Sequence, residues 1–186
     1  VLVRGLAPQF TNISINGEQI PSPEAGVRFV ALDAVPADQL ASIEVSKSLT
    51  PDMDGDAIGG SVNLITRTAT TENLSINGSA LLGYNQIVGR PNFQGSLELG
   101  KRFLNNKLGV MINGSYYESD RGSDNWERDG DELELRDYEL VRTRTGLSST
   151  LDYKLNNNNE FYFRSLYNRF TDREQRRRYI LVPNVD

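Results

Sequence analysis

Hydrophobic and polar positions follow two different patterns on the two sides of a glycine pair, Gly59-Gly60. Before this pair, short apolar runs, one short helical pattern and turns of mixed spacing predict a small α+β unit. After it, apolar and polar residues alternate over long stretches, which is typical of antiparallel β-strands. The glycine pair lets the backbone bend through positive φ before β-branched residues favour strand. The sequence therefore predicts two units, residues 1-70 and residues 71-186.

The first unit contains three strong local signals. Apolar and polar residues alternate on both sides of Asn16-Gly17, and this dipeptide is the strongest short-range signal for a β-hairpin. Residues 36-41 predict one or two helical turns with a proline near the start. Residues 42-47 alternate again and predict a strand.

The remaining segments of the first unit predict strand ends, loops and turns. Residues 3-5 are expected to end a short strand. Two prolines and a glycine indicate that residues 21-28 form an exposed loop. Residues 50-56 predict a polar turn whose aspartates cap a short helix through Ala57 and Ile58.

The second unit is predicted to contain five strands with an apolar face and a polar face. Short turns are expected at residues 89-92, 104-107 and 156-159, and a long polar loop at residues 120-137. The expected strands reach or exceed the ~9 to 11 residues needed to cross a bilayer, whereas a soluble sandwich strand is nearer ~5 to 6 residues. Short turns on one side and a long loop on the other are typical of a transmembrane β-barrel.

Composition excludes several classes of function. The chain has no Cys and no His, which removes disulfides, cysteine-based zinc sites and the commonest nucleophile–base pairs, so we do not expect an enzyme. The net charge of -5 speaks against a nucleic-acid partner, which needs a dominant basic face. No run of ~20 apolar residues predicts a transmembrane helix. Because the chain starts in an apolar strand-like run without Met, we expect it to be part of a longer protein.

Several short motifs resemble the plug domain of TonB-dependent outer-membrane receptors, and their order and spacing match through about residue 68. The family resemblance assigns structural roles in the plug to residues that these motifs contain. The motifs are Val3-Arg4-Gly5, Ile15-Asn16-Gly17, Val35-Pro36-Ala37, Ile43-Glu44-Val45 and, above all, residues 56-66; the plug-motif residues are Arg4, Gly5, Asn16, Gly17, Glu44, Gly59, Gly60 and Asn63.

The resemblance implies a receptor for active transmembrane transport in the outer membrane of a Gram-negative bacterium. Its fold would be an α+β plug segment followed by the first antiparallel strands of a transmembrane β-barrel, about five of an expected total of about 22. The implied partners are the TonB energy-coupling complex of the inner membrane, reached through an N-terminal segment outside this sequence, outer-membrane lipid and lipopolysaccharide, and a small nutrient ligand. No cofactor and no metal are implied.

Candidate ligand residues come from loops predicted to face incoming substrate. In the first unit they are Ser22, Glu24, Arg28 and Asp54. In the second, Trp126 is the only tryptophan and lies in the expected acidic outer loop, where it would stack on a sugar or another flat ligand. The carboxylates around it, like those around Asp54, could hold Ca²⁺, but neither set has EF-hand spacing, and a solvated loop or a capped turn is the alternative.

Arginines toward the C-terminus form a possible basic strip. Inside a barrel they would guide an anionic substrate. Alternatively they pair with carboxylates such as Glu98 and Asp152, or bind lipopolysaccharide phosphates near the rim. The strip consists of Arg142, Arg144, Arg164, Arg169, Arg173, Arg176, Arg177 and Arg178.

The favoured function is energy-coupled uptake of a scarce nutrient, either an oligosaccharide or a siderophore–iron complex. The general character of the barrel strands slightly favours the oligosaccharide. Two other classes stay open: an outer-membrane adhesion or scaffold barrel with an internal domain, and a soluble carbohydrate-binding β protein.

Overall fold

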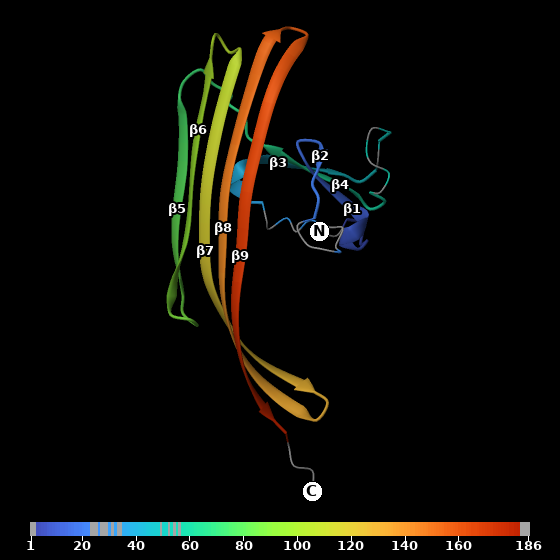
Figure 1. Ribbon diagram of the computed structural model, residues 1–186, viewed down its shortest axis with the longest axis vertical. Helices are drawn as coiled ribbons and strands as arrows, with labels where there is room; N and C mark the ends of the chain where they lie inside the picture. The colour runs from blue at the N-terminus through green and yellow to red at the C-terminus, as the bar shows by residue number, and fades with distance from the viewer. Residues whose placement is uncertain are drawn as a thin grey trace.

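The computed structural model describes residues 3-22, 26, 30, 32, 35-48, 50, 51, 53, 55 and 57-182, without the side chain of Asp129. These residues form two β-sheets, a small mixed sheet and a long antiparallel one (Figure 1). The candidate ligand residues Glu24, Arg28 and Asp54 lie outside the described residues.

The elements are short in the first part of the chain and long in the second. In chain order they are η1 (Pro8–Phe10), β1 (Thr11–Ile15), β2 (Glu18–Gln19), η3 (Ala37–Gln39), β3 (Leu40–Ser46), β4 (Gly60–Thr66), β5 (Ser75–Asn85), β6 (Arg90–Phe103), β7 (Leu108–Asp129), β8 (Glu132–Asn156) and β9 (Asn159–Leu181). Among the described residues, none of the helices has the length and apolar character to span a membrane.

The small sheet has the strand order β2-β1-β4-β3, with β1 and β4 parallel and the other pairs antiparallel. The predicted hairpin is confirmed: Asn16 and Gly17 adopt φ of 51° and 89° between β1 and β2, as a tight turn with two positive φ angles requires. Val62 and Leu64 of β4 are each 1% exposed and occupy the core. The predicted strand at residues 42-47 corresponds to β3.

The expected helices of the first unit are reduced or absent. Residues 36-41 form a single 3-10 turn, η3. Ala57 and Ile58 belong to no helix, because Ile58 lies in a turn that closes with a hydrogen bond from Gly60 N to Ala57 O. At the start of the chain, Arg4 and Gly5 form a turn with φ of 57° and 73°. Within the described residues the first unit is thus a β-sheet with short 3-10 turns rather than a helix-containing α+β unit.

One asparagine side chain connects three parts of the small sheet. Asn63 Oδ1 accepts hydrogen bonds from Gly17 N at 2.9 Å and Ser14 Oγ at 3.1 Å. Asn63 Nδ2 donates to Glu44 Oε2 at 3.2 Å. Nearby, Thr66 N donates to the side-chain oxygen of Asn16 at 3.0 Å. Two other plug-motif residues, Gly17 and Glu44, therefore bond to Asn63.

The glycine pair is required where the chain enters β4. Gly59 N donates to Phe10 O at 2.8 Å, and a Cβ on Gly59 would lie 2.9 Å from that same oxygen. Gly60 has φ of 137°, and a Cβ there would lie 2.6 Å from Ser46 O. Both contacts are too close for a side chain, so the two glycines allow β4 to insert between β1 and β3.

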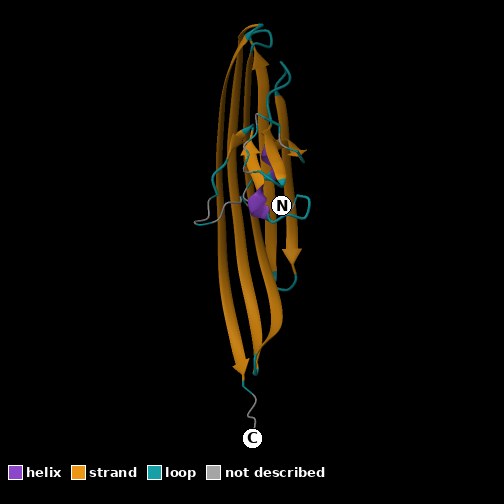
Figure 2. Ribbon diagram, turned by 90° about the vertical axis from the view of Figure 1, so that its right-hand side faces the viewer, coloured by secondary structure: helices purple, strands orange, loops and turns teal. Residues whose placement is uncertain are grey.

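The long sheet is an antiparallel meander in the order β5-β6-β7-β8-β9. Its strands contain 11, 14, 22, 25 and 23 residues, each at least as long as a bilayer crossing needs. The sheet curves along its length and the small sheet lies on its concave side (Figure 1, and turned in Figure 2). We call the face that contacts the small sheet the inner face and the opposite face the outer face.

The two faces differ as the alternation predicts. Exposed apolar side chains gather on the outer face from the turn at residues 104-107 to the level of Tyr116, and beyond that level Glu118 and Asp120 follow in the same series. The exposed apolar residues of this face include Ile76, Leu82, Tyr84, Phe93, Leu97, Leu99, Phe103, Ile112, Tyr116, Leu147, Leu151, Phe163 and Tyr167.

The predicted long loop at residues 120-137 is wrong. β7 continues to Asp129, β8 begins at Glu132, and only Gly130 and Asp131 form the turn, with Gly130 at φ of 61°. The acidic composition is compatible with strand here because opposite charges pair between neighbouring strands, as in the Arg136–Glu127 ion pair. We call the part of β7, β8 and β9 that runs past β6 the extension; it comprises residues 119-142 and 172-181.

Replacing Asn63 by alanine should destabilise the small sheet by about 2 kcal/mol, because Gly17 N, Ser14 Oγ and Glu44 lose a shared partner. Hydrogen exchange of the β1 and β4 amides in the complete protein that contains this chain measures the effect. Asn12→Ala on β1 is the matched control, since no described side-chain hydrogen bond involves Asn12. Equal exchange in the two variants would contradict the role given to Asn63.

Candidate functional site

The small sheet contacts the inner face through η3. Asn113 Nδ2 of β7 donates to Asp38 O at 3.1 Å, and Gln94 Nε2 of β6 donates to Asp38 Oδ2 at 3.4 Å. A Cβ on Gly146 of β8 would collide with the side chain of Gln39. The absence of a side chain at Gly146 therefore allows η3 to lie directly against the long sheet, which we also call the wall.

A second group of contacts lies nearer the turn at residues 104-107. Arg67 forms an ion pair with Glu98 at 3.2 Å. Arg102 Nη1 donates to Ala69 O at 2.8 Å, and Arg102 also pairs with Asp152 at 2.5 Å. Glu98 and Asp152 thus have arginine partners in the described structure, but these partners come from outside the predicted basic strip.

Strand register divides the basic strip between the two faces of the long sheet. Arg142, Arg144, Arg164, Arg176 and Arg178 lie on the inner face. Arg169, Arg173 and Arg177 lie on the outer face. A single strip is therefore not formed, and the two groups require separate explanations.

Arginines and aromatic rings gather on the inner face just past η3, toward the extension. We call this set the arginine–aromatic cluster; it consists of Tyr117, Arg121, Tyr138, Arg142, Arg144, Phe170 and Arg176.

Arg144 is the centre of the cluster. Its Cζ lies 5.2 Å from the ring centroid of Tyr117 and 5.7 Å from that of Phe170. Arg142 lies 5.1 Å from the Phe170 ring and makes a two-bonded pair with Asp172 at 3.0 and 2.7 Å. Register places these residues on adjacent positions of β7, β8 and β9, with Tyr117 opposite Arg144 and Phe170 on its other side.

The cluster carries excess positive charge. Asp172 pairs with Arg142, and Glu174 pairs with Arg176 at 3.1 Å. Arg144 forms no ion pair with any described residue, and its buried Nε has no hydrogen-bond partner among them. The guanidinium of Arg144 therefore keeps its positive charge beside the two rings, and a charge of this kind favours a carboxylate, phosphate or phenolate oxygen.

Other buried polar atoms lie between η3 and the arginine–aromatic cluster. They have no hydrogen-bond partners in the described part of the chain. Both side-chain polar atoms of Gln39, which is fully buried, are unpaired, as are Ser115 Oγ, Asn113 Oδ1 and Asn168 Oδ1. Buried polar groups require hydrogen-bond partners, which ordered water or a polar ligand can supply. The region between η3 and the arginine–aromatic cluster is therefore polar, and water can hydrate it.

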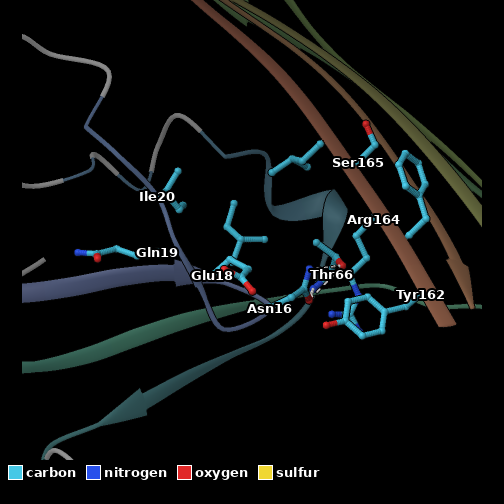
Figure 3. Close-up of a pocket in the computed structure, with 11 residues that line it drawn as sticks. Asn16, Glu18, Gln19, Ile20, Thr66, Tyr162, Arg164 and Ser165 are labelled. Atoms are coloured by element: carbon cyan, nitrogen blue, oxygen red, sulfur yellow. Dashed lines mark hydrogen bonds between the residues drawn. The ribbon is translucent and has the colours of Figure 1, made fainter. Parts of the chain in front are cut away.

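Two hollows separate the small sheet from β9 at the other end of the inner face. The first, of about 530 Å³, is lined by the hairpin and Thr66 on one side and by Tyr162 and Arg164 on the other (Figure 3). The second, of about 430 Å³, shares Tyr162 and Arg164 and continues to Asp152. Arg164 lies 4.5 Å from the Tyr162 ring centroid. The small sheet thus contacts β7 and β8 through η3 and leaves space toward β9.

The structure brings together only part of the predicted candidate set. Ser22 follows β2 and is half-buried. Trp126 is 71% exposed and lies on the outer face of the extension, opposite in face to the cluster. No three acidic side chains among the described residues are placed to hold a metal ion. The predicted basic strip contains Arg142, Arg144 and Arg176 of the cluster but not Arg121. The aromatic residues Tyr117, Tyr138 and Phe170 were not predicted either, and their signal was an aromatic residue at an inner strand position close to an arginine.

Comparison with solved structures identifies the fold. The structure matches the ferric enterobactin receptor PfeA in complex with BCV-L6, with a TM-score of 0.50 and 18% identity over 80% of this chain and 26% of that chain. A mutant of the same receptor from Pseudomonas aeruginosa gives a TM-score of 0.50 and 19% identity over the same shares, 80% and 26%. The chain shares the fold of the matched part of this receptor. This agreement confirms, at the level of fold, the resemblance found in the sequence.

The matched part is about a quarter of PfeA, as the covered share of 26% shows. Both matched structures are of the ferric enterobactin receptor PfeA. No protein-family model matches the chain, and no curated protein matches it.

The carboxyl group of Asp172 should titrate below the ordinary range near ~3.9. Hydrogen bonds from Arg142 lower the pKa of Asp172 against the opposing effect of burial, with further help from the charges of Arg142, Arg121 and Arg144. A lowered folded-state pKa means that the pair stabilises the protein above the unfolded-state pKa and that this contribution is lost as pH falls through the folded value. Carbon NMR of labelled aspartate, assigned with Asp172→Asn, measures the midpoint; a value at or above ~3.9 would contradict the pairing.

Proposed function

We propose that this chain is part of a TonB-dependent outer-membrane receptor that takes up an anionic, aromatic siderophore–iron complex. Residues 1-70 would form part of the plug and residues 71-186 the first strands of the barrel. The single observation that carries the ligand class is the unpaired Arg144 between the rings of Tyr117 and Phe170.

The outer face supports a position in the outer membrane. Along β6, the outward positions from Phe93 to Phe103 are apolar or glycine except for Lys101, which lies 5.2 Å from the Phe103 ring. Ten residues of strand span roughly 33 Å, and a tilt of about 40° reduces the height to roughly 25 Å, the height of the apolar band of an outer-membrane barrel. The change to Glu118 on β7 then marks the outer boundary of this band.

The charge and shape of the cluster favour a siderophore complex over an oligosaccharide. Neutral sugars are bound mainly by hydrogen bonds and aromatic stacking, and they do not require unpaired cations. Arg144 and Arg121 offer positive charge beside aromatic faces, which suits an anionic ligand with flat rings. The ferric enterobactin receptors with the same fold support this choice.

The polar contacts of the small sheet support energy-coupled release. Its contacts with the wall through Asp38, Arg67 and Ala69 are hydrogen bonds and an ion pair, which water can replace. We therefore assign the coupling partner to the TonB complex of the inner membrane, which would act through a segment outside this sequence and move the plug relative to the wall.

Arg144→Gln should weaken binding of ferric enterobactin, the probe, by at least about tenfold, because removal of a charge-assisted contact to a ligand is worth roughly 1.5 to 3 kcal/mol. Binding to the complete protein in detergent is measured by quenching of intrinsic fluorescence. Arg177→Gln is the matched control, since Arg177 lies on the outer face of the same sheet. Unchanged affinity in Arg144→Gln, or equal losses in both variants, would reject this ligand site.

Energy coupling has a separate test in cells that carry the complete receptor. Dissipating the proton-motive force should abolish accumulation of radiolabelled ferric siderophore while leaving binding at the cell surface intact. Accumulation that survives an uncoupler would instead indicate a passive pore or scaffold.

A further inference from the structure

Gln39 of η3 is the largest buried polar side chain at the contact between the two sheets. The residue is 0% exposed, and neither its Nε2 nor its Oε1 has a hydrogen-bond partner among the described residues. Burying an amide without partners is costly, so such a group normally has bound water or another polar molecule beside it. The burial of this amide therefore indicates a site for a small polar molecule.

The amide of Gln39 lies over a position of the wall that has no side chain. A Cβ on Gly146 of β8 would collide with Gln39 Nε2 and would lie 2.9 Å from Ser115 Oγ. In the strand register, Ser115 of β7, Gly146 and Asn168 of β9 form one row across the inner face. The buried atoms Ser115 Oγ and Asn168 Oδ1 also have no described partner. The row beneath Gln39 thus offers unpaired polar atoms on both sides of Gly146.

The next row toward the extension contains Arg144. Arg144 and Gly146 are two residues apart on one face of β8, so their backbone positions are separated by roughly 7 Å. The buried Nε of Arg144 has no described partner, whereas its Cζ lies between the rings of Tyr117 and Phe170. Two hydrogen bonds of ~2.9 Å through one water molecule span nearly ~6 Å. One or two water molecules can therefore connect the Gly146 row to Arg144.

The unpaired atoms form a mixed set of donors and acceptors. Gln39 Nε2 and Arg144 Nε are donors, and Ser115 Oγ can donate or accept. The acceptors are Gln39 Oε1, Asn168 Oδ1 and Asn113 Oδ1. Water suits such a set because each molecule both donates and accepts. A cation would satisfy the acceptors alone, and the charge of Arg144 would repel it.

We propose that ordered water over Gly146 joins Gln39 to Arg144, and that Gln39 is a positioning residue for the ligand site. In this role Gln39 does not contact the ligand itself. Through water it holds the Nε side of the guanidinium, and the two Nη groups stay directed to the anionic ligand. The affinity for ligand then depends on the place of η3 against the wall. The inference rests on the proposed ligand site at Arg144 and adds the small sheet to it.

Gln39→Leu should weaken binding of ferric enterobactin to the complete protein by about fivefold, because the guanidinium loses a water-mediated contact. Arg67→Gln is the control for a general loosening of the small sheet. It removes the ion pair between Arg67 and Glu98 at 3.2 Å, a contact between the same two sheets that lies away from the Gly146 row. Its affinity should stay within about twofold of the wild-type value.

A double variant separates positioning from independent effects. In the Arg144→Gln background, Gln39→Leu should lower the affinity by no more than about 1.5-fold, since the group that Gln39 positions is gone. Independent effects would multiply and give the full further loss of about fivefold. Unchanged affinity in Gln39→Leu, equal losses in Gln39→Leu and Arg67→Gln, or independent effects in the double variant would each overturn the positioning role.

A measurement without ligand separates this inference from the siderophore proposal. NMR of the complete protein in micelles, with nitrogen-labelled arginine, detects the Nε–H signal of Arg144, which Arg144→Gln assigns. The signal should show a cross-peak with water, and it should shift in Gln39→Leu but not in Arg67→Gln. A signal without the cross-peak, or one that Gln39→Leu leaves in place, would overturn the water link. If the signal behaves as expected and ferric enterobactin does not bind, the siderophore proposal fails and the water link stands.

Discussion

The two-residue alternation of the long sheet is the constraint on which the rest of the structure depends. Each residue of β5 to β9 points either to the small sheet or away from it, and a shift of register by one residue would exchange the two faces. The register from Phe93–Glu118 across to Thr143–Thr171 is continuous. Hence one continuous pairing pattern fixes the apolar band, the polar inner face, the arginine–aromatic cluster and the outer-face arginines together.

The small sheet is stabilised in a different way from its contact with the wall. Val62 and Leu64 are buried in its own core, and Asn63 connects its strands by hydrogen bonds. Its contacts with the long sheet include hydrogen bonds and an ion pair beside a few apolar groups such as Pro36 and Ala69. Several buried polar atoms there, including both of Gln39, have no partner among the described residues. The core of the small sheet is therefore apolar, whereas its boundary with the long sheet contains many polar groups.

Local signals in the sequence predicted the elements that depend on neighbouring residues. The Asn16-Gly17 turn needs two positive φ angles, which few dipeptides supply, and the hairpin formed where expected. The long strands kept their alternation because apolar side chains gather on the outer face and polar ones on the inner face. Residues 120-137 lost that alternation, because charged residues occupy positions on both faces there and Trp126 is the one large exposed apolar residue that they contain among the described residues. The acidic composition then resembled a loop.

The candidate site could not be predicted to the same extent. Tyr117, Arg144 and Phe170 come from three strands, and only the register of β7, β8 and β9 brings them together. The sequence showed the arginines but not which face each would occupy, so Arg144 and Arg169 were placed in one strip although they lie on opposite faces. Trp126 was predicted to bind ligand because of its aromatic ring and its place in an expected loop. Its position in a strand and on the outer face follows from its pairing with Leu135, which no local sequence pattern indicates.

The polar boundary between the two sheets has a mechanical consequence. Sliding an apolar interface apart exposes surface that water solvates poorly, so the resistance rises with every square ångström uncovered. At the η3 contact, hydrogen bonds such as that from Asn113 to Asp38 exchange one by one for bonds to solvent. Separating the small sheet from the long sheet at this contact therefore exposes polar groups that water can solvate, and it leaves the core of the small sheet closed.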